Sequence, residues 1–128
     1  MRVVAGVIVD RGEVLACRRG PFTELSGKWE FPGGKVETNE TDHDALVREI
    51  EEELSAQISV GNLIAETSQL RGLGKITMFT YFCELLGPRP IQSSDHDQLL
   101  WLPIGELRTL DWAELDIPVV AKLLSTPN

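Results

Sequence analysis

The sequence predicts a single mixed α/β domain that takes in all 128 residues. Three observations support this prediction. The length falls within the range of about 100–150 residues that is commonest for one domain. Apolar runs with strand character alternate with segments that suit helices, one central and one near the C-terminal end. The chain shows no internal repeat, linker or low-complexity tract at which a second domain would begin.

Five short runs favour strands because they are rich in apolar, β-branched or aromatic residues. They cover residues 3–9, 14–17, 29–31, 76–86 and 99–102. Residues 57–70 begin with β-branched residues and then become mixed. Pro32-Gly33-Gly34 is expected to end the third run, and residues 10–13, 18–28 and 88–97 suit turns or loops.

Two segments favour helices. Residues 41–54 contain no Gly or Pro that would break a helix. Asp116-Ile117-Pro118 is typical of an N-cap followed by proline in the first turn, so a last helix is expected to run to about Leu124. Residues 103–110 suit one or two helical turns. The strands, one central helix and a terminal helix fit a mixed α/β fold, and periodicity alone supports nothing more specific.

The net charge of −8, from 20 acids and 12 bases, is concentrated in one segment. Residues 36–56 contain eight acids and one base, which gives −7 and leaves −1 for the rest of the chain. Such a surface repels a polyanion, so binding to duplex nucleic acid is not expected. A concentration of carboxylates suits hard divalent cations instead.

The apolar runs are far shorter than the roughly 20 residues that span a bilayer, so no membrane association is expected. Charged residues 10–13 follow the first run where a signal peptide would need small residues for cleavage, and a cytoplasmic protein is the expectation. Cys17 and Cys83 lie in strand-like runs and are expected to be buried free thiols. His43 and His96 form no metal-ligand pair and are expected at the surface.

The central helix carries its acids beside its apolar stripe. On an ideal helix, the stripe is formed by Leu46, Val47, Ile50 and Leu54. Glu49, Glu52 and Glu53 fall next to it, and like charges at i and i+4 weaken a helix by a few tenths of a kcal/mol. A solvated acidic face is the alternative interpretation. The position beside the buried stripe, and the Gly-Gly loop just before the helix, favour a cation site.

The spacing of these residues resembles the Nudix signature over a box of about residues 34–56. The matching positions are Gly34, Glu40, Arg48-Glu49, Ile50 and Glu52-Glu53. The stretches around residues 29–32, 101–102 and 116–118 also resemble the MutT-like branch. Two positions depart: Ser55 stands in place of Gly and Ala56 in place of a larger aliphatic. The glycine position calls for a left-handed backbone, so either serine adopts it at a cost of about 1 kcal/mol or the turn takes another shape.

The resemblance implies a Nudix fold, in which a mixed sheet is sandwiched between helices and the box presents a metal site. It implies Mg²⁺, with Mn²⁺ as an alternative, bound mainly by Glu49 and Glu53. Glu52 would assist, and the Gly33 carbonyl would complete the site. Arg48 would orient the glutamates from outside the metal site, and Glu40 would lie farther away.

The implied activity is hydrolysis of a nucleoside triphosphate to a monophosphate and pyrophosphate. Arg19 and Lys35 are the candidates for clamping phosphates. Asp95 matches the position of a general base, with Glu49 or Glu52 as alternatives. Asp116 would read the nucleobase or serve only as an N-cap. The candidates for flanking the base are Phe31 and Leu73.

An oxidised guanine nucleotide such as 8-oxo-dGTP is the favoured substrate, which would give the protein a role in DNA repair. Cytidine triphosphates, including 5-methylated ones, are the close alternative. A catalytically inactive Nudix domain that binds nucleotides as a regulatory module is a different class of function. The presence of every metal-binding acid argues against it. The sequence leaves open a monomer or a homodimer.

Overall fold

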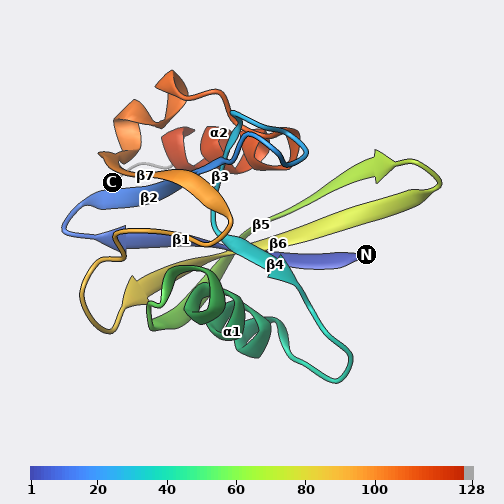
Figure 1. Ribbon diagram of the computed structural model, residues 1–128, viewed down its shortest axis with the longest axis horizontal. Coiled ribbons are helices and arrows are strands. Elements are labelled where there is room, and N and C mark those ends of the chain that lie inside the picture. Colours follow the sequence, from blue (N-terminus) through green and yellow to red (C-terminus); the bar gives the residue numbers. More distant parts are fainter. Residues whose placement is uncertain (126–128) are drawn as a thin grey trace.

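The computed structural model describes residues 1–125, which form a seven-stranded sheet with a helix on either side (Figure 1). The strands are β1 (Arg2–Asp10), β2 (Glu13–Arg19), β3 (Trp29–Glu30), β4 (Gly33–Lys35), β5 (Ile58–Arg71), β6 (Gly74–Leu85) and β7 (His96–Pro103). The helices are α1 (Asp42–Leu54) and α2 (Ile117–Ser125), with the 3₁₀ turns η1 (Ile104–Thr109) and η2 (Glu114–Asp116) before α2.

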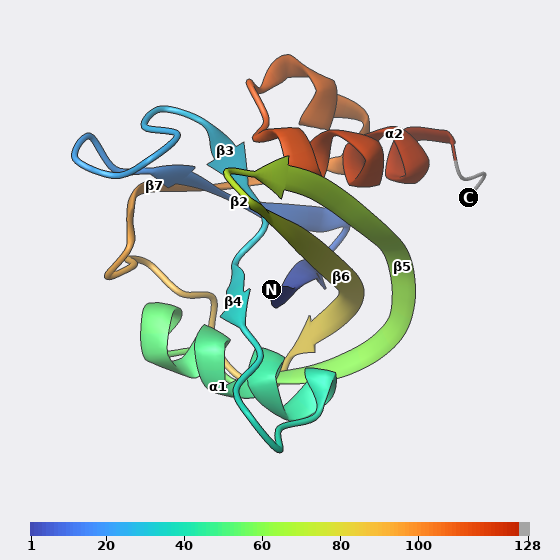
Figure 2. The same cartoon turned by 90° about the vertical axis from the view of Figure 1, so that its right-hand side faces the viewer.

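Strand β1 is the centre of the sheet, and its pairing divides the sheet into two leaves. Along its length β1 runs parallel to β6, which pairs in turn with β5. On its other side it pairs with β2 only at Val9 and Asp10, and with β4 at residues 3–5. Strand β2 continues with β3 and β7 as partners. Figure 2 shows the result: β2, β3 and β7 diverge from the curved β5–β6 ribbon, with β4 between them.

Each face of the sheet has its own apolar core because side chains alternate along a strand. From β1, Val4 and Ile8 pack toward α1, whereas Ala5 and Val7 pack toward the α2 side. Strand β2 divides its side chains between the two cores in the same way. The prediction of a mixed sheet sandwiched between helices is therefore confirmed. No helix within residues 1–125 is both long enough and apolar enough to cross a membrane.

Helix α1 begins and ends close to the predicted residues. The Thr41 side chain caps it by accepting a hydrogen bond from the Asp44 backbone N–H at 3.1 Å. At its C-terminal end Ser55 adopts the predicted left-handed conformation, with φ 52° and ψ 37°. The buried stripe differs in one member: Ala45 is fully buried and Val47 is exposed. The helix therefore faces the core slightly differently than the ideal projection predicted.

Three strands depart from the sequence predictions. Gly33-Gly34 does not simply end a strand but begins β4, which pairs with β1. Strand β5 extends from Ile58 to Arg71 as one element with register shifts between residues 60 and 65. Those bulges break the alternation that would have identified a long strand. Strand β7 begins at His96, three residues earlier than predicted.

Candidate active site

Two hollows meet at the mouth between the two leaves of the sheet. The first has a volume of about 450 Å³, within the range usual for small-molecule sites. The second, about 560 Å³, lies beside the C-terminal end of α1. Both are lined by Arg19, Glu30 and Gly33, so the two hollows adjoin at these residues. We call the first the apolar pocket and the second the acidic cleft.

The acidic cleft reaches α1 at Glu53. Glu53 lines it, and its Oε2 is buried with no hydrogen-bond partner within residues 1–125. Burial, together with the charges of Asp95, Glu49 and Glu30, raises the pKa of Glu53 to about 9. Four carboxylates therefore act on one another at this end of the helix. The helix C-terminus, which carries partial negative charge, adds to the repulsion.

Glu49 lies against β4, where glycine is required. A Cβ on Gly34 would overlap the Glu49 carboxylate, coming within 2.8 Å of Oε1 and closer to its other atoms. A Cβ on Gly33 would overlap the backbone of β1, coming within 2.8 Å of Ala5 Cα. The two glycines thus let β4 lie close to β1 and to Glu49 at once. Only residues without a side chain allow both approaches.

Arg48 binds the acids from the flank of the helix. It donates to Glu40 at 2.7 and 2.9 Å, to Glu49 at 2.9 Å and to Glu52 at 3.3 Å. The hydrogen bond from Arg48 lowers the pKa of Glu40 to about 2, with help from the backbone N–H of Glu37. The Arg48–Glu40 pair therefore fixes the guanidinium. Glu49 is 17% exposed and Glu52 61% exposed, so Glu52 lies mainly in solvent.

The apolar pocket contains Asp116 and Phe31. Asp116 is buried, and its Oδ1 accepts a hydrogen bond from the Phe31 backbone N–H at 3.0 Å. Burial raises the pKa of Asp116 well above its ordinary value, although the Phe31 N–H opposes the shift. No protein group within residues 1–125 donates to Oδ2 of Asp116. The carboxyl thus joins Phe31, the residue after β3, to the end of η2, just before α2.

The remaining predicted substrate residues divide between the hollows and the surface. Arg19 lies at the junction of the two hollows, and Lys35 lines the apolar pocket. Phe31 is buried against Trp112, with ring centroids 4.6 Å apart. Leu73 lies at the exposed tip of the β5–β6 hairpin and does not line the pocket. The apolar walls come instead from residues such as Val3, Ala5, Ile76, Met78, Ala113 and Leu115.

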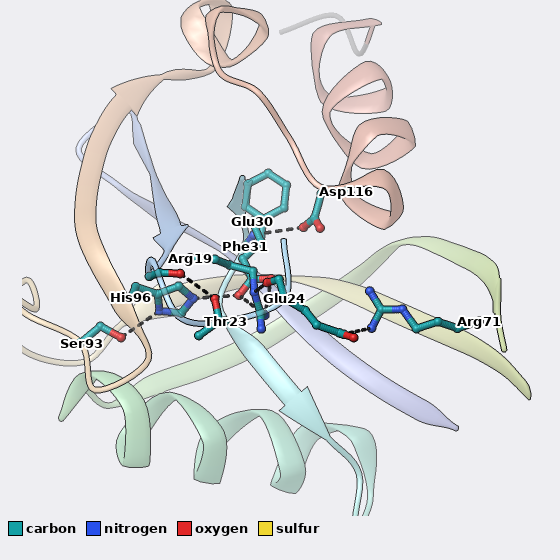
Figure 3. Close-up of polar contacts among 10 residues, drawn as sticks. Arg19, Thr23, Glu24, Glu30, Phe31, Arg71, Ser93, His96 and Asp116 are labelled. Atoms are coloured by element: carbon teal, nitrogen blue, oxygen red, sulfur yellow. Dashed lines mark hydrogen bonds and ion pairs between the residues drawn. The ribbon is translucent and has the colours of Figure 1, made fainter. Parts of the chain in front are cut away.

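The site contains two further residues, Glu30 and His96, that the sequence did not single out as functional. Glu30 lines both hollows, and its Oε2 lies 2.8 Å from His96 Nε2, within hydrogen-bonding distance (Figure 3). The expectation that His96 lies at the surface is wrong, because its side chain is only 2% exposed. His43 is exposed, as expected. Glu30 stands in the Trp29–Pro32 stretch of the resemblance, which was the only sequence signal for it.

Within residues 1–125, no three His, Cys, Asp or Glu side chains are already gathered around one point as metal ligands would be. Glu49 and Glu53 lie side by side, whereas Glu52 is turned toward Arg48 and solvent. Cys17 and Cys83 are buried and free, as expected, and neither contributes to the cleft. The acidic cleft therefore offers oxygen ligands, mainly carboxylates, and no thiolate.

Comparisons with known proteins show which family the chain resembles over its length. The Nudix domain family matches residues 1–123. A Mycobacterium tuberculosis protein provisionally named 8-oxo-dGTP diphosphatase 2 is 40% identical, over 98% of this chain and 89% of the relative. The Escherichia coli CTP pyrophosphohydrolase is 32% identical, over 98% of this chain and 92% of the relative.

The solution structure of the Escherichia coli ORF135 protein superposes with a TM-score of 0.86 at 31% identity, covering 97% of this chain and 88% of that one. The similarity thus extends over both leaves of the sheet and both helices. It agrees with the family match, which spans nearly the whole chain. On this sequence and structural similarity, the chain is a member of the Nudix hydrolase family.

Proposed function

We propose that this protein hydrolyses a nucleoside triphosphate, with water, to a nucleoside monophosphate and pyrophosphate. The observation that carries the proposal is that the apolar pocket and the acidic cleft adjoin at Arg19, Glu30 and Gly33. A base in the pocket would extend its phosphates past Arg19 into the cleft. The relatives named as diphosphatases and pyrophosphohydrolases support the same reaction class.

The cleft fits a divalent cation, and Nudix hydrolases generally need one. Within residues 1–125 the Oε2 of Glu53 has no partner, and once Glu53 is ionised it and the adjoining carboxylates repel one another unless a cation is present. We assign Glu49 and Glu53 as the main ligands, with Glu52 assisting and the Gly33 carbonyl completing the site. Mg²⁺, or Mn²⁺ in its place, supplies charge neutralisation for the phosphates and lowers the pKa of a bound water.

The protein groups around the cation have separate tasks in this proposal. Arg48 holds Glu49 in place from the flank. Arg19 and Lys35 bind phosphate oxygens on the side of the apolar pocket. Asp95, whose charge acts on Glu53, accepts the proton of the attacking water at its carboxylate. The backbone N–H of Ser94 donates to the Glu53 carbonyl at 3.0 Å, which holds the loop with Asp95 beside the helix.

The metal-binding role is tested with Glu53→Gln, and with Glu51→Gln as the matched control. Glu51 lies on the exposed side of the same helix turn, outside the acidic cleft. Mg²⁺-dependent pyrophosphate release should fall at least tenfold in Glu53→Gln and remain near wild type in Glu51→Gln, with both variants folded. A Glu53→Gln enzyme retaining more than about a tenth of the wild-type rate would refute the ligand role. Absence of pyrophosphate release from wild type would favour the inactive regulatory module.

Asp116 is the proposed base-reading residue, and 8-oxo-dGTP is the favoured substrate. Asp116 lines a pocket of suitable size, and its Oδ2 has no donor within residues 1–125, so the carboxyl can bind the polar edge of guanine. A CTP or 5-methyl-CTP substrate is the second candidate, because the Escherichia coli relative is named for CTP. A carboxyl can also bind the exocyclic amino group of cytosine.

A panel of (d)NTPs with wild type, Asp116→Asn and Asp116→Ala separates these candidates. A base-reading role predicts that the substitutions change the ranking of substrates. An equal loss on every nucleotide would show that Asp116 only joins Phe31 to the end of η2. We also propose that the protein is cytoplasmic and that it is a monomer or a homodimer.

A further inference from the structure

We infer that His96 is a positioning residue that holds Glu30, and through Glu30 orients the Arg19 guanidinium toward the phosphate chain. The inference rests on the proposed function, because it assigns a role within the same site. It starts from a continuous line of hydrogen bonds that runs from Ser93 through His96 and Glu30 to Arg19 (Figure 3).

The partners of His96 fix which ring nitrogen carries the proton. Its Nε2 lies 2.8 Å from Glu30 Oε2, and an ionised carboxylate only accepts, so Nε2 must be the donor. In the neutral ring Nδ1 is then an acceptor, and it lies 2.8 Å from the Ser93 hydroxyl, which can donate to it. Ser93 Oγ itself accepts the backbone N–H of Asp95 at 3.2 Å. The ring is thus held on both sides.

Glu30, held by His96, in turn fixes the position of the Arg19 guanidinium. Its two carboxylate oxygens lie 3.2 and 3.3 Å from Arg19 Nη1. The Nε of Arg19 donates to the Glu24 carbonyl at 2.7 Å. Two of the three guanidinium nitrogens are therefore fixed by the protein, while Nη2 has no acceptor within residues 1–125. A guanidinium held in this way is preorganised to bind an anion through its remaining donors.

Exposure increases along the line from the core to the hollows. The side chain of His96 is 2% exposed, that of Glu30 20% and that of Arg19 32%. Arg19 also lines both hollows, so a nucleotide extending from one into the other passes its guanidinium. A purely structural role would need only a contact between β7 and β3. The hydrogen bonds instead lead from the buried His96 to the charged Arg19, which lies where the two hollows meet.

Two substitutions at His96 separate positioning from mere packing. In glutamine the terminal amide nitrogen stands about where Nε2 stands, so His96→Gln can still donate to Glu30. In asparagine the amide stands about where Nδ1 stands, so His96→Asn can meet Ser93 but cannot reach Glu30. We expect His96→Asn to lose about 10–100-fold in kcat/KM, mainly through a raised KM. His96→Gln should remain within about threefold of wild type, with thermal unfolding showing that both variants are folded.

A double-mutant cycle with Arg19→Ala tests whether His96 acts through Arg19. If it does, adding His96→Asn to Arg19→Ala should produce no further loss. Losses that multiply, or equal losses in His96→Gln and His96→Asn, would overturn the inference.

The ring nitrogens of His96 give a readout that needs neither metal nor turnover. Long-range ¹H–¹⁵N NMR of the neutral ring should show the Nε2–H tautomer in wild type. The Nδ1–H tautomer would overturn the inference even in an active enzyme. Because this measurement is independent of hydrolysis, a failure of the proposed function and a failure of the positioning role are distinguishable.

Discussion

Replacing Gly34 by alanine should disable the enzyme while leaving the fold nearly intact. The new Cβ would lie 2.8 Å from Glu49 Oε1 and closer still to the carboxylate carbon, whereas ordinary contacts begin at 3.4 Å. The Glu49 carboxylate must therefore retreat by about 1 Å, a displacement that can cost about 100-fold in rate. Because a flexible side chain absorbs the overlap, the free energy of unfolding should change by less than about 1 kcal/mol.

Two other glycines supply the comparison. In Gly33→Ala the added Cβ meets the backbone of β1, so this variant should lose about 1–3 kcal/mol of stability. In Gly105→Ala nothing lies within 4 Å, so activity and stability should both stay near wild type. The measurements are Mg²⁺-dependent pyrophosphate release and urea unfolding on all three variants. A Gly34→Ala enzyme with wild-type kcat would refute the placement of Glu49 in the reaction.

Three further predictions concern the supporting structure. Ser55→Gly should raise the free energy of unfolding by about 1 kcal/mol without changing kcat, because glycine adopts φ 52° without strain; a destabilised variant would contradict this. Arg48→Lys should lower kcat by about 10–100-fold, because lysine cannot hold Glu40 and Glu49 together; an unchanged kcat would show that Arg48 does not position the acids. The hydrogen bonds from Arg2 and Tyr81 hold the pKa of Asp42 below its ordinary 3.8. The stability that ionised Asp42 contributes is therefore complete above pH 3.8 and is lost as the pH falls through the lowered pKa. Urea unfolding should therefore show Asp42→Asn less stable than wild type at neutral pH, with the difference shrinking in acid, and a difference independent of pH would count against the pairing.

Local features of the chain were predictable from sequence. The extent of α1 follows from the Thr41 cap and from the absence of Gly and Pro in its interior. The left-handed Ser55 follows from the spacing of the signature, although serine is not the residue that this backbone favours. Both depend on contacts within a few residues. Periodicity and capping describe such contacts well.

Features that depend on distant contacts were not predictable. The burial of His96 follows from Glu30, which lies 66 positions away in the chain. The role of Asp116 changes because the N–H that it binds belongs to Phe31, 85 positions away. Leu73 had the right chemistry for a base pocket, but the length of the β5–β6 hairpin carries it beyond the pocket. A single sequence contains no record of such distances.

The central claim is that Glu53 and its neighbours bind a divalent cation, and cation-dependent stability tests it most directly. Urea unfolding of wild type and Glu53→Gln would be compared with and without Mg²⁺, at a concentration 100 times the wild-type Kd. Binding to the folded state alone should stabilise wild type by about 2.7 kcal/mol and Glu53→Gln by much less. Equal stabilisation of the two proteins, or none in wild type, would contradict the account.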